Sequence, residues 1–189
     1  MQTSPPPAGP DGSGGDGRLS EELVSVIADA RRRARRGGDR QIDTAHLLHG
    51  LLESDPAVRE VFDGGPAGAA RLLGYLVQRA IGYGLRWSGR VEDSGALPRV
   101  RAGGRAGGPG GPGYGGVAAG WSPAAAAALG RALAGARSRG AACAEGLDLL
   151  IAIAGDADCR AVEVIRRAGV DPARLVATAH RPECQQSTG

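Results

Sequence analysis

The chain has 189 residues, of which 42% are apolar and 3% aromatic, and its formal net charge is +3. This length suits one ordinary domain or two small repeats that share a core. With so few aromatic residues, the core must consist of Leu, Val, Ile and Ala, and we therefore expect an all-α fold of closely packed helices. The small charge gives little reason to expect binding to nucleic acid or a membrane by charge alone.

Several classes of chemistry are excluded by residue usage. All 23 basic residues are arginine, and with 33 glycines this is typical of GC-rich coding. Without lysine, a phosphate-loop ATPase or a Schiff-base enzyme is excluded. The odd number of cysteines, Cys143, Cys159 and Cys184, argues for reduced thiols rather than a disulfide framework. Because no membrane-length apolar run or signal peptide is present, we expect a cytoplasmic protein.

Start and stop signals predict a first helix. Residues 1–18 are rich in Pro, Gly and Ser and are expected to be a disordered tail. Ser20 is a good N-cap, Glu21 and Glu22 suit the positive end of the helix dipole, and Gly37-Gly38 supplies the stop.

The stretch Ile42–Leu52 predicts a second, short and buried helix. Thr44 is expected to cap it, and Leu47, Leu48 and Leu51 then share one face. Two further helices are expected, one from Ser54-Asp55-Pro56 through Val58, Val61 and Phe62, and one from Pro66 to Gly82 or Gly84.

Periodicity fades after the fourth helix, and residues 85–120 are expected to form a flexible glycine-rich linker. The spacing Gly108-x-Gly110-x-x-Gly113 matches a dinucleotide-binding pattern, but no predicted strand precedes it. A stretch with so many glycines matches this spacing by chance. The linker therefore predicts no cofactor site.

A second set of helices follows the linker. Trp121-Ser122-Pro123 begins one that runs to Arg139-Gly140, and a short apolar helix comes next. Of the last two helices, the first ends at Gly169 and the second begins at Asp171-Pro172. Residues 182–189 are expected to form a polar tail.

The two halves match in order and spacing. Ser20 corresponds to Ser122 and His46 to Asp148, each pair being 102 positions apart, and the second half has about two extra residues before Val162. We therefore predict two pseudo-symmetric four-helix repeats, residues 19–84 and 121–181, that cover each other's apolar faces.

These residues resemble a known family. The run from Ile42 to Leu51, I-D-T-A-H-L-L-H-G-L, looks like I-G-T-E-H-L-L-L-G-L in the N-terminal double-repeat domain of the Clp unfoldases, especially the ClpC-like branch. Trp121-Ser122-Pro123 is similar to the family's aromatic-Thr-Pro start, and Gly169-Val170-Asp171 to its helix-to-helix turn. The resemblance spans Leu19 to Ala179 apart from the linker.

The resemblance implies a free-standing, non-catalytic recognition domain without a cofactor, whose partner is a polypeptide substrate, an adaptor or a Clp ATPase. In the ClpC branch each repeat has a pocket for arginine-phosphorylated protein, formed by a hydroxyl at a helix start and a glutamate. The hydroxyls correspond to Ser20 and Ser122, whereas Ala45 and Leu147 replace the two glutamates. Because a carboxylate would pair with the guanidinium of that ligand, we expect a different ligand here.

Two alternative functions remain. One is a decoy or regulator that competes with the N-domain of an intact Clp ATPase for ligands, including cyclic-peptide antibiotics. The other is nucleic-acid binding by the arginine cluster Arg31–Arg36 and by Arg99, Arg101 and Arg105 in the linker.

The remaining candidate residues have structural interpretations. His46 and His49 lie three apart, but no third ligand has a recognisable metal-site spacing, so His46 is expected to cap or pack near the helix start. No catalytic dyad is indicated. Leu19 and Trp121 are candidates for a partner surface, and Trp87 for a packing or binding anchor, although Trp121 also suits a structural role at the entry of the second repeat.

Overall fold

The structure is a computed structural model that describes residues 18–39, 41–80 and 120–180. The predicted tails and linker lie outside these residues except for Arg18 and Gly120, as do Trp87, Cys184 and the linker arginines. Arg18 was expected in the disordered tail but lies in a short strand, because it pairs with Cys143 of the other half. Repeat boundaries inside the linker therefore stay predictions.

The described residues form eight helices and two very short strands. The first half contains β1 (Arg18–Leu19), α1 (Glu21–Gly37), α2 (Thr44–Ser54), α3 (Pro56–Glu60) and α4 (Gly65–Ala80). The second half contains α5 (Pro123–Ser138), β2 (Cys143–Ala144), α6 (Gly146–Ala154), α7 (Arg160–Arg167) and α8 (Pro172–Ala179). The predicted all-α fold with four helices in each half is confirmed.

Most helix ends follow the predicted signals. The Ser20 hydroxyl accepts from the Leu23 amide at 3.1 Å, and Ser122 does the same for Ala125 at 3.1 Å. Gly38 ends α1 with φ 73°, a left-handed conformation that glycine adopts without steric cost.

Three boundaries differ from the prediction, the smallest difference being that α4 begins at Gly65 rather than Pro66. The N-cap of α2 is Asp43 rather than Thr44, because the Asp43 carboxylate accepts from the His46 amide at 2.9 Å. Thr44 begins the helix, and its hydroxyl is used elsewhere. Helix α3 ends at Glu60, so Val61 and Phe62 lie just after it instead of within it.

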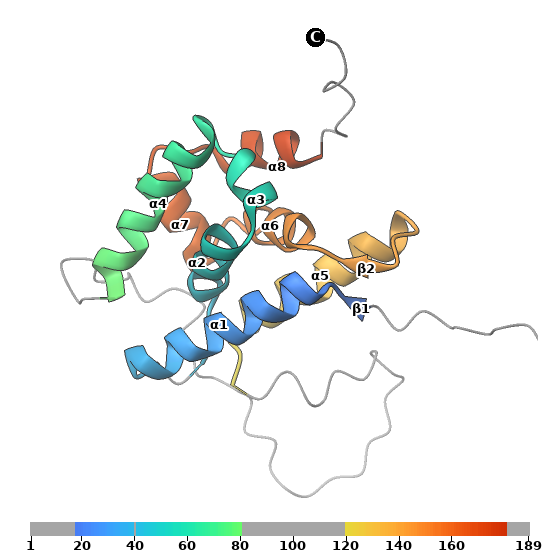
Figure 1. Cartoon of the computed structure of the whole chain (residues 1–189), viewed down its shortest axis with the longest axis horizontal. Coiled ribbons are helices and arrows are strands. Elements are labelled where there is room, and N and C mark those ends of the chain that lie inside the picture. Colours follow the sequence, from blue (N-terminus) through green and yellow to red (C-terminus); the bar gives the residue numbers. More distant parts are fainter. Residues whose placement is uncertain (1–17, 40, 81–119, 181–189) are drawn as a thin grey trace, which may run out of the picture.

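The two most buried helices, α2 and α6, form the centre of the molecule (Figure 1). Helices α1 and α5 lie on one side of them, and α3, α4, α7 and α8 lie on the other. Packing crosses between the halves, since α2 contacts α7 and α6 contacts α3. One hydrophobic core therefore runs through both halves.

Two backbone hydrogen bonds relate the halves by approximate two-fold symmetry. Ser20 N donates to Ala144 O at 3.0 Å, and Ser122 N donates to Ile42 O at 2.8 Å. Ser20 and Ile42 of the first half correspond to Ser122 and Ala144 of the second half, since each pair is 102 positions apart. The two hydrogen bonds are therefore equivalent, with the donor in the first half in one and in the second half in the other. We call this junction the repeat seam: residues 18–20 beside 143–144, and residue 42 beside 120–122.

Candidate functional site

The repeat seam places each candidate serine beside a helix start of the other half. The bond from Ser20 reaches the segment that leads into α6, where Leu147 lies in the first turn. The bond from Ser122 reaches the segment that leads into α2, where Ala45 lies in the first turn. The four positions therefore fall into two quasi-equivalent sites, each built from both halves.

The two sites differ in accessibility. Ser20 and Leu147 are half-buried, whereas Ser122 and Ala45 are each 1% exposed. Both serine hydroxyls accept a bond from their own helix, which orders α1 and α5 at the seam. The site of Ser20 and Leu147 is thus the more open of the two.

Two acidic groups at these helix starts, Asp43 and Asp148, are engaged within the fold. Asp43 is buried and forms an ion pair with Arg160 of α7 at 2.8 Å. Asp148 is 5% exposed, pairs with Arg139 at 2.5 Å and accepts from the Glu145 amide at 3.0 Å. Both carboxylates therefore already have partners within the fold.

His46 caps α2, as expected from its place near the helix start. Its Nδ1 accepts from the Asp43 amide at 3.2 Å, and its Nε2 lies 3.1 Å from Asp39 Oδ2. At the position equivalent to His46 in the second half, Asp148 pairs with Arg139.

His49 lies one turn further along α2 and makes a separate contact. Its Nε2 is 3.2 Å from Glu53 Oε1, and Glu53 also pairs with Arg33. Burial, reinforced by the Arg33 charge, lowers the pKa of His49, while Glu53 opposes that shift. Within residues 18–39, 41–80 and 120–180, no group of three His, Cys, Asp or Glu side chains is arranged to hold a metal ion.

The predicted partner-surface residues are largely covered in this structure. Leu19 is half-buried and Trp121 is 4% exposed. Trp121 also forms a backbone bridge with Ile42, which fits a structural role at the entry of the second repeat. A partner surface at these two residues stays a prediction.

Comparisons with known proteins identify the architecture. No protein-family model matches the chain. The N-terminal domain of the chaperone ClpD from Arabidopsis thaliana superposes with a TM-score of 0.55 at 17% sequence identity, over 86% of this chain and 92% of that domain. The chain has the fold of a Clp N-terminal domain. A chain from a study of a malarial protein secretion system matches with the same coverage, identity and TM-score.

Two contacts that hold this Clp N-terminal fold together were not predicted from the sequence. The Asp43–Arg160 ion pair and the bond from Ala161 N to Thr44 Oγ1, at 3.0 Å, both join residues 117 positions apart. They join the start of α2 to the start of α7, which lies beyond the extra residues of the second half. The 102-residue offset that relates the halves therefore gave no signal for them.

A surface pocket of about 360 Å³ also lies at α7. Arg166 donates to Ala157 O at 3.1 Å and pins the preceding loop, while Arg167 pairs with Glu163 at 2.6 Å. Of the charged side chains that line the pocket, Glu163 and Arg167 thus pair with each other, and Arg160 pairs with Asp43. Separately, none of the helices in the described ranges is long and apolar enough to cross a bilayer.

Proposed function

We propose that this protein is a non-catalytic recognition domain that binds a polypeptide in the cytoplasm, either a substrate, an adaptor or a Clp ATPase. The observation that carries the proposal is the repeat seam, where a Clp N-terminal fold keeps both helix-start serines in two quasi-equivalent sites. The residue similarity to the ClpC-like branch supports the same function.

The ligand differs from that of the ClpC-like pocket. Ala45 and Leu147 present apolar groups where a guanidinium would need a carboxylate, and nearby Asp43 and Asp148 are already paired. A ligand in contact with Ala45 and Leu147 is therefore held there by apolar contact, while the exposed Glu145 keeps one carboxylate near the site of Ser20 and Leu147. An unmodified polypeptide, or a cyclic peptide, has this chemistry.

A direct test uses the full chain and two labelled polypeptides, one unfolded and unmodified, the other phosphorylated on arginine. We expect binding of the unmodified polypeptide, no preference for the phosphorylated one, and no ATP hydrolysis. A strong preference for the phosphorylated polypeptide would show that the glutamates are dispensable. Failure to bind either polypeptide, or any Clp component, would contradict the proposal.

A substitution that restores a carboxylate at the more open site tests whether the loss of the glutamate changed the ligand. Leu147→Glu restores an acid beside Ser20, and because Leu147 is half-buried the new carboxylate can stay in contact with water. We expect this variant to gain affinity for arginine-phosphorylated protein. Leu147→Gln, of similar size but uncharged, is the control and is expected to gain none.

The decoy function remains the alternative proposal. Added to a reconstituted Clp protease, a decoy would slow substrate degradation by competing with the N-domain of the ATPase. A recruiting adaptor would instead speed degradation at limiting concentrations. Titration of a cyclic-peptide antibiotic in the same assay shows whether the two proteins share that ligand, since a decoy would relieve the effect of the antibiotic.

A further inference from the structure

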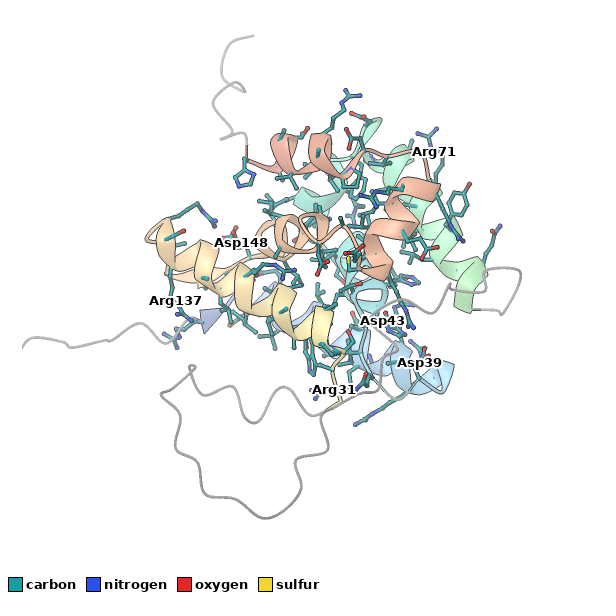
Figure 2. The ribbon with its side chains drawn as sticks, turned by 180° about the vertical axis from the view of Figure 1, so that it is seen from behind. Arg31, Asp39, Asp43, Arg71, Arg137 and Asp148 are labelled. Carbon is teal, nitrogen blue, oxygen red and sulfur yellow. The ribbon has the colours of Figure 1, made fainter. Side chains whose placement is uncertain are left out.

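The carboxyl-terminal part of α1 carries a dense group of arginines that the proposed binding sites do not use. Arg31, Arg32, Arg35 and Arg36 are exposed, and we call these four the α1 arginine patch. Arg33 turns away from it and pairs with Glu53 of α2. Figure 2 shows Arg31 at the edge of the molecule, on the side opposite Arg71.

Within the part of the chain that the structure describes, three of the four patch arginines have no side-chain partner. Arg32 pairs with Asp29, but Arg31, Arg35 and Arg36 make no ion pair or hydrogen bond with any described residue. Many arginines elsewhere are engaged, for example Arg131 with Asp156 and Arg167 with Glu163. The high arginine content of the chain therefore does not by itself account for this group of unpaired charges.

The patch does not serve the stability of the helix. Arg31 and Arg35, and likewise Arg32 and Arg36, are four residues apart, where like charges repel and destabilise a helix. The dipole at the carboxyl end favours Arg35 and Arg36 by a similar amount, so the net effect of the four charges on the helix is small. A compact set of unpaired cations on a surface attracts anionic partners, and this is the use that fits the patch.

The size and surroundings of the patch indicate the kind of anion. From Arg31 to Arg36 the helix rises about 7.5 Å, which spans only two or three anionic groups. Asp29 pairs with Arg32 of the patch, Glu53 pairs with the adjacent Arg33, and Asp39 directly follows the end of α1. A nucleic-acid backbone that continued beyond the patch would meet these carboxylates, whereas a short run of acidic side chains would not.

We propose that the α1 arginine patch binds a short acidic segment of a partner polypeptide. This inference rests on the proposed protein-binding function and adds the charge of the partner. Because Ser20 precedes α1 and the patch lies near its far end, about 16 Å along the helix, the patch is separate from the more open site of Ser20 and Leu147.

The experiment uses the full chain and a fluorescein-labelled Gly-Ser peptide that contains a run of glutamates. Its control peptide has glutamine at the same places. The test variant is Arg31→Gln with Arg35→Gln, and the matched control variant is Arg71→Gln with Arg174→Gln, two exposed arginines on α4 and α8. We expect about fivefold weaker binding for the test variant and no change for the control variant. Added salt should also weaken the wild-type complex.

Several outcomes would overturn the proposal: equal binding of the glutamine peptide, an equal loss in the control variant, or tighter binding of single-stranded DNA through the same arginines. Circular dichroism of both variants excludes unfolding as the cause of any loss. Binding of an unfolded polypeptide without acidic runs is measured in parallel and reports on the repeat seam. If that binding persists while the acidic peptide fails, only the patch proposal is wrong.

Discussion

At the scale of single residues, a few positions are fixed by contacts between the two halves. Gly146 begins α6 against Asp55, the residue that caps α3 by accepting from the Val58 amide at 3.2 Å. A Cβ at Gly146 would overlap Asp55 Oδ2 and lie 3.2 Å from Leu51 Cδ2. The glycine is therefore required for close approach and not for an unusual backbone conformation.

The prediction for this position is a loss of stability in Gly146→Ala. The added methyl would displace the Asp55 side chain and remove the cap of α3, at a cost of about 1 kcal/mol or more. Gly130→Ala is the matched control, because its Cβ would meet no atom within 4 Å and alanine favours the interior of α5. Urea denaturation should show opposite shifts, and equal shifts would contradict this account.

His49 makes stability depend on pH. Since burial and Arg33 lower its pKa below the ordinary value of 6.5, the unfolded chain takes up the proton first as the pH falls. Its contribution is fully present above about pH 6.5 and is lost at lower pH, by at most about 1.4 kcal/mol per pH unit. Denaturation midpoints measured from pH 7 to pH 5 should fall less steeply in His49→Gln than in the wild type. Identical slopes would exclude this role.

At the scale of elements, helix α7 depends on a residue of the other half. Its own N-cap, Cys159, makes no side-chain bond to the helix, whereas Thr44 of α2 accepts from Ala161 N at 3.0 Å. The cap is thus supplied across the repeats. This use of the hydroxyl also explains why Asp43 caps α2 instead of Thr44.

Removal of this cap is expected to destabilise the protein. Thr44→Val keeps the shape but leaves a buried amide unpaired, which costs about 1–3 kcal/mol. Thr44→Ser keeps the hydroxyl and should retain most of the stability. Amide hydrogen exchange gives a specific readout, because Ala161 should lose protection in the valine variant only. An equal loss of stability and of Ala161 protection in both variants would indicate an effect of packing instead of the lost hydrogen bond.

At the scale of the whole molecule, the repeats form a single unit. They share one core, the repeat seam joins them on one side, and the Asp43–Arg160 ion pair joins α2 to α7 inside the fold. Neither half encloses its apolar faces alone, which is the usual property of repeats that stack on each other.

Breaking the buried ion pair should therefore destabilise both halves together. Arg160→Ala leaves Asp43 without its buried counter-charge, at a cost of about 3–5 kcal/mol, and unfolding should remain one cooperative transition by circular dichroism. Arg174→Ala is the control, because its contact with Asp63, at 3.6 Å, is exposed and contributes little. Two separate transitions in the Arg160 variant would show that the halves fold independently.

The sequence by itself determined the elements and their repetition. Helix starts such as Ser20, Ser122 and Asp171-Pro172, and stops such as Gly38, are local signals whose physics involves only nearby backbone groups, so they were predicted correctly. The 102-residue offset indicated two equivalent halves, and the motif around His46 indicated the Clp N-terminal fold that the structural similarity confirms.

Only the tertiary structure decided how the halves meet. Thr44 and Asp43 are both good caps, and the choice between them depended on Ala161, a residue 117 positions away. The pairing of Ser20 with the start of α6, and of Ser122 with the start of α2, likewise arises between distant segments. A hydrogen bond between such segments depends on how the helices pack, and local propensity carries no information about that packing.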